Sequence, residues 1–211
     1  MSVFKLQYFA DPMCSWCYGF SPVISRLQHE HGDQLQLDLI MGGLRPYQNQ
    51  PLPESTRQEI FHHWHEVERM TGQPFCRRGA LVPGFVYDTE PACRAVVLLR
   101  RLHPQQALAY LAGLQRAFYA EGRDITRHAV LAEIAAGHGA DAKAFTAALD
   151  AQTARRDAQA DFSRTHDALV EGFPTLLLER SGRRALRLAI GFVPYDELCT
   201  RLREHELLDA A

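Results

Sequence analysis

Two stretches near the start of the chain and two near its end carry the apolar pattern of β-strands. Residues 3–9 (VFKLQYF) are mostly apolar, and residues 35–41 (LQLDLIM) alternate before becoming fully apolar. Residues 172–179 (GFPTLLLE) and 185–190 (ALRLAI) show the same preference. Such runs predict strands with a buried face. We expect the first two to be parallel and the last two, joined by a short turn at 181–182, to be antiparallel.

The rest of the chain shows the spacing of helices. Apolar positions recur every three or four residues over 15–31, where Pro22 predicts a kink or a restart because it lacks an N–H. From 54 to 170 the sequence is rich in Ala, Leu, Glu, Gln and Arg and shows no strand pattern. Helices are predicted there over 54–70, 89–102, 105–120, 126–136, from 141 onward and over 153–169, and Thr89, Thr126 and Asp141 are predicted as N-caps of three of them. A last helix is predicted to begin at Pro194.

This order of elements predicts an α/β protein in two parts. A strand–helix–strand unit (1–53) and a strand–strand–helix unit (171–211) are expected to form one discontinuous domain around a shared sheet. The segment 54–170 is expected to be an all-helical insertion. A chain of 211 residues is long enough to bury a full core in this arrangement.

The composition makes some classes of binding partner unfavourable but does not identify the function. The hydrophobic fraction of 46%, the charged fraction of 23% and the net charge of −2 are ordinary for a globular protein. They favour neither nucleic acid nor an anionic membrane surface as a partner. The first residues lack the pattern of a signal peptide, and no stretch has the apolar length of a membrane span. We therefore expect a cytoplasmic protein, and the sequence predicts no oligomeric state.

Cys14 and Cys17 form a Cys-x-x-Cys motif at the predicted start of the first helix. Two cysteines at this spacing lie within one turn, close enough for a disulfide. The N-terminus of a helix carries a partial positive charge and unpaired N–H groups, so it stabilises a thiolate in its first turn. In a reducing compartment such a pair is more often redox-active than structural. The motif therefore predicts a thiol–disulfide site.

Two other interpretations of these cysteines are weaker. Half of a zinc site would need two more ligands, but the chain has no second Cys-x-x-Cys. The histidines of residues 62–65 (HHWH) do not share the four-residue spacing of a helical zinc site, and only His62 and Glu66 do. A solvated helix face explains them, and no metal is predicted. A pair of purely structural cysteines is the remaining alternative.

Four further residues have both a functional and a purely structural interpretation, and a fifth, Cys199, has only a structural one. Asp11 is either a turn former before Pro12 or a group that moves protons for the cysteines. Cys76 and Cys93 are either free thiols or a second disulfide, and Cys199 is expected to be a buried thiol of the last helix. Arg45 is the one charged residue of the stretch GGLRP, where a contact with a substrate anion is conceivable.

The motifs in their order resemble the DsbA-like family, most of all its cytosolic FrnE-like branch. The matching stretches are FADPMCSWC at 9–17, GGLRP at 42–46, FYAEGRDI at 118–125 and GFPTL at 172–176. The resemblance covers essentially the whole chain and implies a thioredoxin fold interrupted by a helical domain. It also implies a protein disulfide oxidoreductase or isomerase.

The resemblance also implies roles for individual residues. Cys14 would be the exposed nucleophile and Cys17 the resolving thiol. Pro174 would follow a cis peptide bond beside the disulfide, leaving the backbone of Phe173 free to pair with an extended substrate. Trp16 would offer that substrate an apolar surface. Protein or peptide disulfides are the implied substrates, with a reductase or glutathione as the electron partner and no tightly bound cofactor.

Two alternative functions remain at this stage. Glutathione-dependent isomerases and kappa-type glutathione transferases resemble this chain in outline and act on small molecules. They have a serine where Cys14 stands and lack the second cysteine. A chaperone-like binder with an incidental disulfide is the other alternative, and it predicts activity that is independent of both cysteines.

Overall fold

The sheet brings the two ends of the chain together. A computed structural model describes residues 4–79, 81–179 and 185–208. Its four strands stand in the order β2-β1-β3-β4, where β1 is Phe4–Ala10, β2 Leu35–Met41, β3 Thr175–Leu178 and β4 Leu186–Ile190. β1 and β2 are parallel, whereas β3 is antiparallel to both β1 and β4. The predicted fold class, a thioredoxin-like α/β fold with a helical insertion, is confirmed.

One strand is shorter than the sequence predicts. β3 begins at Thr175, so Gly172, Phe173 and Pro174 lie before the sheet rather than in it. The Thr175 hydroxyl donates to the Gly172 carbonyl at 2.8 Å and closes a turn there, and Pro174 has no N–H to give to a ladder. The predicted turn at 181–182 falls outside the described residues.

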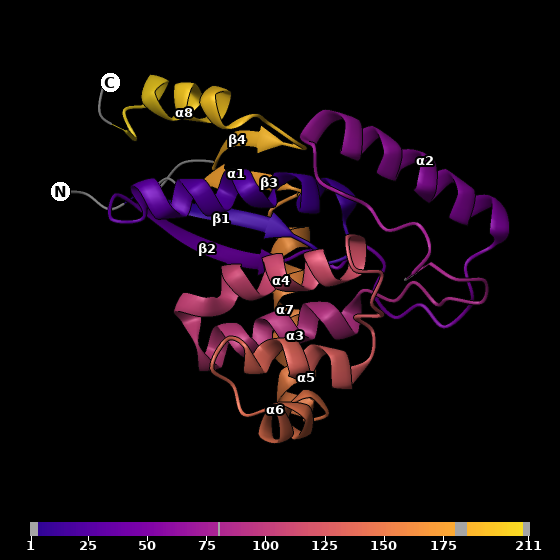
Figure 1. Ribbon diagram of the computed structural model, residues 1–211. Coiled ribbons are helices and arrows are strands. Elements are labelled where there is room, and N and C mark those ends of the chain that lie inside the picture. Colours follow the sequence, from indigo (N-terminus) through magenta and orange to yellow (C-terminus); the bar gives the residue numbers. More distant parts are fainter. Residues whose placement is uncertain (1–3, 80, 180–184, 209–211) are drawn as a thin grey trace.

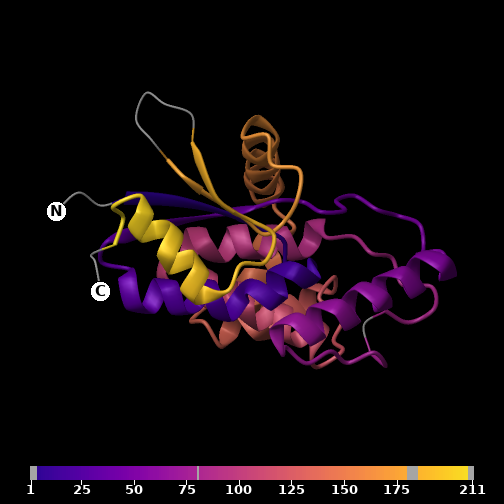
Figure 2. The ribbon, with the colours of Figure 1, turned by 90° about the horizontal axis from the view of Figure 1, so that it is seen from above.

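The helices surround the sheet unequally. Their bounds are α1 Ser15–His31, α2 Glu54–Thr71, α3 Glu90–Leu102, α4 Ala107–Tyr119, α5 His128–Ala136, α6 Ala142–Leu149, α7 Gln152–Asp167 and α8 Tyr195–Glu204. Figure 1 shows α3 to α6 below the sheet and α8 above it, while α2 extends to one side. Figure 2 shows α7 on the side of the sheet opposite to α8. None of the helices in the described residues is long and apolar enough to span a membrane.

Helix α1 passes through Pro22 without a restart, contrary to one of the two predicted outcomes. Proline at this position leaves the carbonyl of Tyr18, four residues earlier, without its helical donor. The side-chain amide of Gln73 donates to that carbonyl at 3.2 Å. A residue of the segment after α2 therefore replaces the missing hydrogen bond and lets the helix continue.

Two predicted helix caps behave differently from expectation. Thr89 precedes α3 as predicted, but its hydroxyl accepts from the N–H of Arg45 at 3.1 Å instead of capping the helix. α5 begins at His128, two residues after the predicted cap Thr126, whose hydroxyl donates to Asp124 at 2.6 Å. Tertiary and local hydrogen bonds thus take over hydroxyls that the sequence alone assigns to helix ends.

A common core joins the sheet and the helical segment. In the described parts of 54–170, every residue is helix, turn or loop. Tyr18 of α1 nevertheless stacks on Tyr119 of α4, with 5.0 Å between the ring centroids. A smaller apolar cluster on another part of the sheet contains Phe9, Ile40 and Leu177. The division into two domains therefore stays a prediction.

A buried ion pair fastens α7 to α3 and to the end of β2. Asp161 of α7 is 2% exposed and accepts two hydrogen bonds from the Arg100 guanidinium, at 2.8 and 3.0 Å. The same carboxylate accepts the N–H of Met41 at 2.9 Å. These bonds hold β2 in place immediately before the stretch GGLRP.

Candidate active site

Cys14 stands at the beginning of α1. Its backbone is extended (φ −94°, ψ 117°), and its carbonyl accepts the N–H of Tyr18 at 3.0 Å. It is therefore the N-cap residue, at the end of the helix where unpaired N–H groups favour a negative charge. At 6% exposure it is buried, contrary to the prediction of an exposed nucleophile, but it contributes to the lining of a cleft.

Cys17 lies one turn further along α1 and is fully buried. Burial is the main reason why the pKa of its thiol is raised well above the ordinary value, and the adjacent Cys14 raises it further. Cys17 therefore keeps its proton at neutral pH. One cysteine faces the cleft and the other is hidden behind it, which is the arrangement that a nucleophile and a resolving thiol require.

Phe173 and Pro174 meet Cys14 from the other end of the chain. The peptide bond between them is cis, as predicted. The Cys14 thiol donates to the Phe173 carbonyl, with 3.4 Å between sulfur and oxygen. The ring of Phe173 lies so close to Gly42 that a Cβ there would stand 2.1 Å from its Cζ atom. Glycine is required at position 42 to admit this ring.

Asp11 is a buried carboxylate that ties three segments together. Its Oδ1 accepts from the N–H of Met13 at 2.8 Å, which is the turn the sequence suggests. Its Oδ2 accepts from the N–H of Leu44 at 2.7 Å and from the Cys93 thiol at 3.3 Å. Burial raises the pKa of Asp11, while these donors oppose the shift. A part in proton transfer stays a prediction, whereas its part in fixing the loops is seen directly.

Three buried tyrosines near the cysteines were not singled out from the sequence. Burial raises the pKa of Tyr8, Tyr87 and Tyr119, and a charge on Cys14 would raise each further. The Tyr87 hydroxyl donates to the Met13 carbonyl and so holds an irregular segment against the motif. Tyr8 shares a face of the buried strand with Leu6, two positions earlier, and this was the one available signal. Tyr87 lies in a segment without any repeat.

A cleft of about 330 Å³ opens above Cys14. Five segments line it: the start of α1, the stretch GGLRP, helix α2, the segment before α3 and the turn before β3. Trp16 and Phe173, which the sequence predicts as substrate-binding, both contribute side chains, as do Arg45 and Tyr87. Pro174 lies next to it in sequence. The volume lies within the range of about 300–1,000 Å³ of small-ligand sites.

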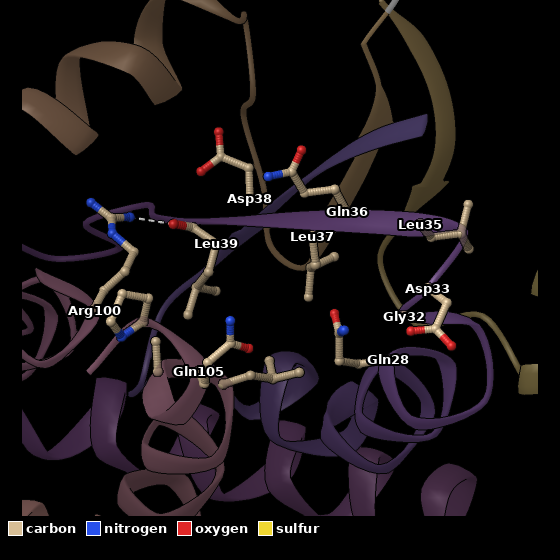
Figure 3. A pocket seen from close by; sticks show the side chains of 13 residues that line it. Gln28, Gly32, Asp33, Leu35, Gln36, Leu37, Asp38, Leu39, Arg100 and Gln105 are labelled. Carbon is tan, nitrogen blue, oxygen red and sulfur yellow. Dashed lines mark hydrogen bonds between the residues drawn. The ribbon is translucent and has the colours of Figure 1, made fainter. Parts of the chain in front are cut away.

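A larger cavity than this cleft lies elsewhere. It has about 700 Å³ and follows the outer edge of β2. Figure 3 shows the side chains of Gln28 and Gln105 directed toward this strand, and the hydrogen bond from Arg100 to the Leu39 carbonyl at one end. None of its lining residues belongs to the cleft above Cys14. We take the smaller cleft as the candidate site because Cys14, the predicted nucleophile, lines it.

The other cysteines are free thiols, so the second disulfide is not present. The Cys93 thiol donates a hydrogen bond to the Asp11 carboxylate. Cys199 is buried at 3% exposure in α8, as predicted. Cys76 donates its backbone N–H to the Tyr119 carbonyl at 2.6 Å and lies in the loop after α2.

In the HHWH stretch, Trp64 is buried among aromatic rings, and both Trp64 and His63 line the cleft. The described residues contain no group of three or more potential metal ligands.

The difference between the two cysteines leads to a first prediction. With iodoacetamide at pH 7.5, we expect Cys14 to be alkylated first and Cys17 about 100-fold more slowly, because a buried protonated thiol is a poor nucleophile. The pH lies below the raised pKa of Cys17, so its thiolate is scarce. Mass spectrometry of peptides at timed intervals measures both rates. Equal rates in the folded protein would contradict this assignment, and equal rates in urea serve as the control.

Comparisons with known proteins agree with this geometry. The sequence pattern of the DSBA-like thioredoxin domain family matches residues 5–203. A structure from Nitrosomonas europaea, provisionally assigned as a protein disulfide isomerase, is 37% identical, with a TM-score of 0.89 and coverage of 96% of this chain and 97% of that one.

Two further relatives are informative. The cytosolic disulfide reductase DsbM from Pseudomonas aeruginosa is 31% identical, with a TM-score of 0.78 and coverage of 97% of this chain and 100% of DsbM. DsbM has also been crystallised with glutathione. The ClpXP adapter protein SpxH of Halalkalibacterium halodurans is 22% identical over 177 residues, which are 82% of this chain. The chain spans only 58% of the length of that relative.

Proposed function

This chain belongs to the DSBA-like thioredoxin domain family, and we propose that it exchanges disulfides through Cys14 and Cys17. One observation carries the proposal. Cys14 caps α1 at the bottom of a cleft, 3.4 Å from the Phe173 carbonyl, with the protonated Cys17 directly behind it. A nucleophile that lines a cleft and a second thiol buried behind it are the two groups that disulfide exchange needs.

The proposed reaction has two steps. The Cys14 thiolate attacks one sulfur of a substrate disulfide, and the other sulfur leaves as a thiolate that takes up a proton. Cys17 then gives up its proton and attacks the Cys14 sulfur, which releases the second substrate thiol and leaves a Cys14–Cys17 disulfide. Two electrons pass from the cysteine pair to the substrate. The reverse sequence oxidises a substrate dithiol.

The positions of the remaining site residues in the cleft suggest their roles. Trp16 is half-buried beside the nucleophile and offers apolar surface to the substrate. We propose that the backbone of Phe173, held in place before Pro174, pairs with an extended segment that carries the target sulfur. Main-chain pairing of this kind is tolerant of sequence, which suits protein or peptide disulfides.

Similarity to DsbM supports the finer parts of the proposal. DsbM is described as a cytosolic disulfide reductase and was crystallised with glutathione. We propose a cytosolic location, membership of the FrnE-like branch, and glutathione or a reductase as the electron partner. Glutathione mixed disulfides are then substrates along with protein disulfides. The presence of both cysteines in one turn favours this chemistry over the glutathione-dependent isomerase alternative.

The reduction potential of the Cys14–Cys17 pair tests the proposal. Titration in glutathione buffers, followed by the fluorescence change from Trp16, is expected to show a two-electron transition that Cys17→Ser abolishes. A potential near −270 mV, about that of thioredoxin, supports a reductase, and one above about −200 mV supports an oxidant or isomerase. If no disulfide forms at any glutathione ratio, the proposed function is wrong.

A further inference from the structure

Arg45 is a half-buried cation at the wall of the cleft, and its charge is unmatched. It forms no ion pair and no side-chain hydrogen bond with any described residue, and its guanidinium lies 5.6 Å from the centre of the Tyr87 ring. Other arginines withdrawn from solvent have carboxylate partners: Arg94 pairs with Glu90 and Arg100 with Asp161. A partly desolvated guanidinium without a carboxylate is a ready site for an external anion.

The backbone of Arg45 is fixed before any ligand arrives. Its N–H donates to the Thr89 hydroxyl at 3.1 Å, and its carbonyl accepts the N–H of Thr89 at 3.1 Å. The preceding residue, Leu44, donates its N–H to the buried Asp11 carboxylate. Because the loop is already held in place by these bonds, binding at Arg45 requires ordering only of its side chain.

The cleft around Arg45 suits an anionic thiol compound. Its lining contains no Asp or Glu, and besides Arg45 it includes His63. His63 is exposed, and its Nδ1 lies 3.5 Å from the Glu66 carboxylate. Arg45 is therefore the residue of this lining whose positive charge has no carboxylate partner among the described residues. Apolar side chains, among them Trp16 and Leu44, form the other walls. Cys14 at the bottom supplies the group that reacts with sulfur.

We propose that Arg45 binds a carboxylate of the glutathione moiety in glutathione mixed disulfides and makes them preferred over uncharged disulfides. This inference rests on the proposed function of the same site. The Cys14 thiolate attacks the glutathione sulfur, and the protein thiolate leaves and is protonated. A second glutathione then loses its proton and attacks the glutathione sulfur of this mixed disulfide, which forms glutathione disulfide and releases the Cys14 thiolate. Glutathione is thus both the recognised group and the reductant.

A binding experiment tests the inference without relying on turnover. The probe is S-methylglutathione, which carries both carboxylates but cannot exchange, and calorimetry measures its Kd for the full chain. We expect Arg45→Gln to weaken binding about tenfold and Arg45→Lys to restore part of the loss, since a carboxylate pairs best with the guanidinium fork. Arg155→Gln, which removes one exposed charge from α7, is the matched control and should leave the Kd unchanged.

Kinetics separate this inference from the function on which it rests. For Arg45→Gln, the ratio of kcat/KM for glutathione disulfide to that for 2-hydroxyethyl disulfide is expected to fall about tenfold. An unchanged ratio, or a Kd equally altered in Arg155→Gln, overturns the role of Arg45 while the exchange activity stands. Absence of S-methylglutathione binding to the wild-type protein also overturns it. Arg45-dependent binding without any disulfide turnover would instead refute the proposed function alone.

Discussion

Replacement of Cys14 by serine is expected to lower the rate of insulin-disulfide reduction by a factor on the order of 10³ or more, because a serine hydroxyl stays protonated and does not attack a disulfide. The fold should survive, since the change is small and Cys14 precedes the first residue of α1. Turbidity of precipitating insulin chains in the presence of a thiol reductant measures the rate. Retention of full activity would refute the role of Cys14 and favour the chaperone-like binder.

Two companion variants make the result specific. Cys76→Ser changes a cysteine that lies away from the cleft lining and should keep wild-type activity. Cys17→Ser keeps the nucleophile but removes the resolving thiol, so a mixed disulfide on Cys14 should accumulate and be visible by mass spectrometry. If Cys14→Ser, and not Cys17→Ser, trapped the substrate, the assigned order of the two cysteines would be reversed.

Replacement of Asp161 by alanine is expected to lower the free energy of unfolding by about 3 kcal/mol, because removing one partner of a buried ion pair leaves the other charge uncompensated. The side chain of Asp161 is 2% exposed and that of Arg100 is 25% exposed. The N–H of Met41 would lose its acceptor as well. Urea unfolding followed by circular dichroism measures the change.

The same helix supplies a matched control. Asp157 pairs with Arg101 at 3.0 Å, but both side chains are more than 40% exposed. Solvent screens such a pair, so Asp157→Ala should cost no more than about 0.5 kcal/mol. Similar losses in the two variants would show that burial does not determine the strength of these pairs. If Asp161→Ala does not fold, Asp161→Asn, which keeps the size of the side chain, gives the comparison.

Local patterns in the sequence were sufficient for much of the fold. The alternation of residues 35–41 predicted β2 with its observed bounds, and the spacing around Cys14 predicted the start of α1. Asp141 was identified as a cap, and its carboxylate accepts the N–H of Ala144 at 2.8 Å. These features depend on residues a few positions apart, which compete mainly with water and with their immediate neighbours.

The failures share one cause. Thr89 had the sequence of a helix cap, yet its hydroxyl is used by Arg45, 44 positions earlier in the chain. Pro22 was predicted to kink or restart its helix, yet the helix does not restart, because Gln73 supplies the missing donor. In both cases a distant residue offers a hydrogen bond that local reasoning cannot include. The hydrogen-bond partner at each position is therefore decided by which groups the fold brings near.

The sequence by itself determined the chemistry of this protein: two cysteines in the first turn of a helix, in a chain whose strands and helices follow their periodicities. The tertiary structure decided which cysteine lines the cleft, and it placed the Phe173 carbonyl beside Cys14 across 159 positions. It also left Arg45 without a carboxylate partner among the described residues of the cleft that Cys14 lines, while Arg94 and Arg100 received theirs. The physical reason is that burial and electrostatic pairing depend on neighbours in space, which no local pattern specifies.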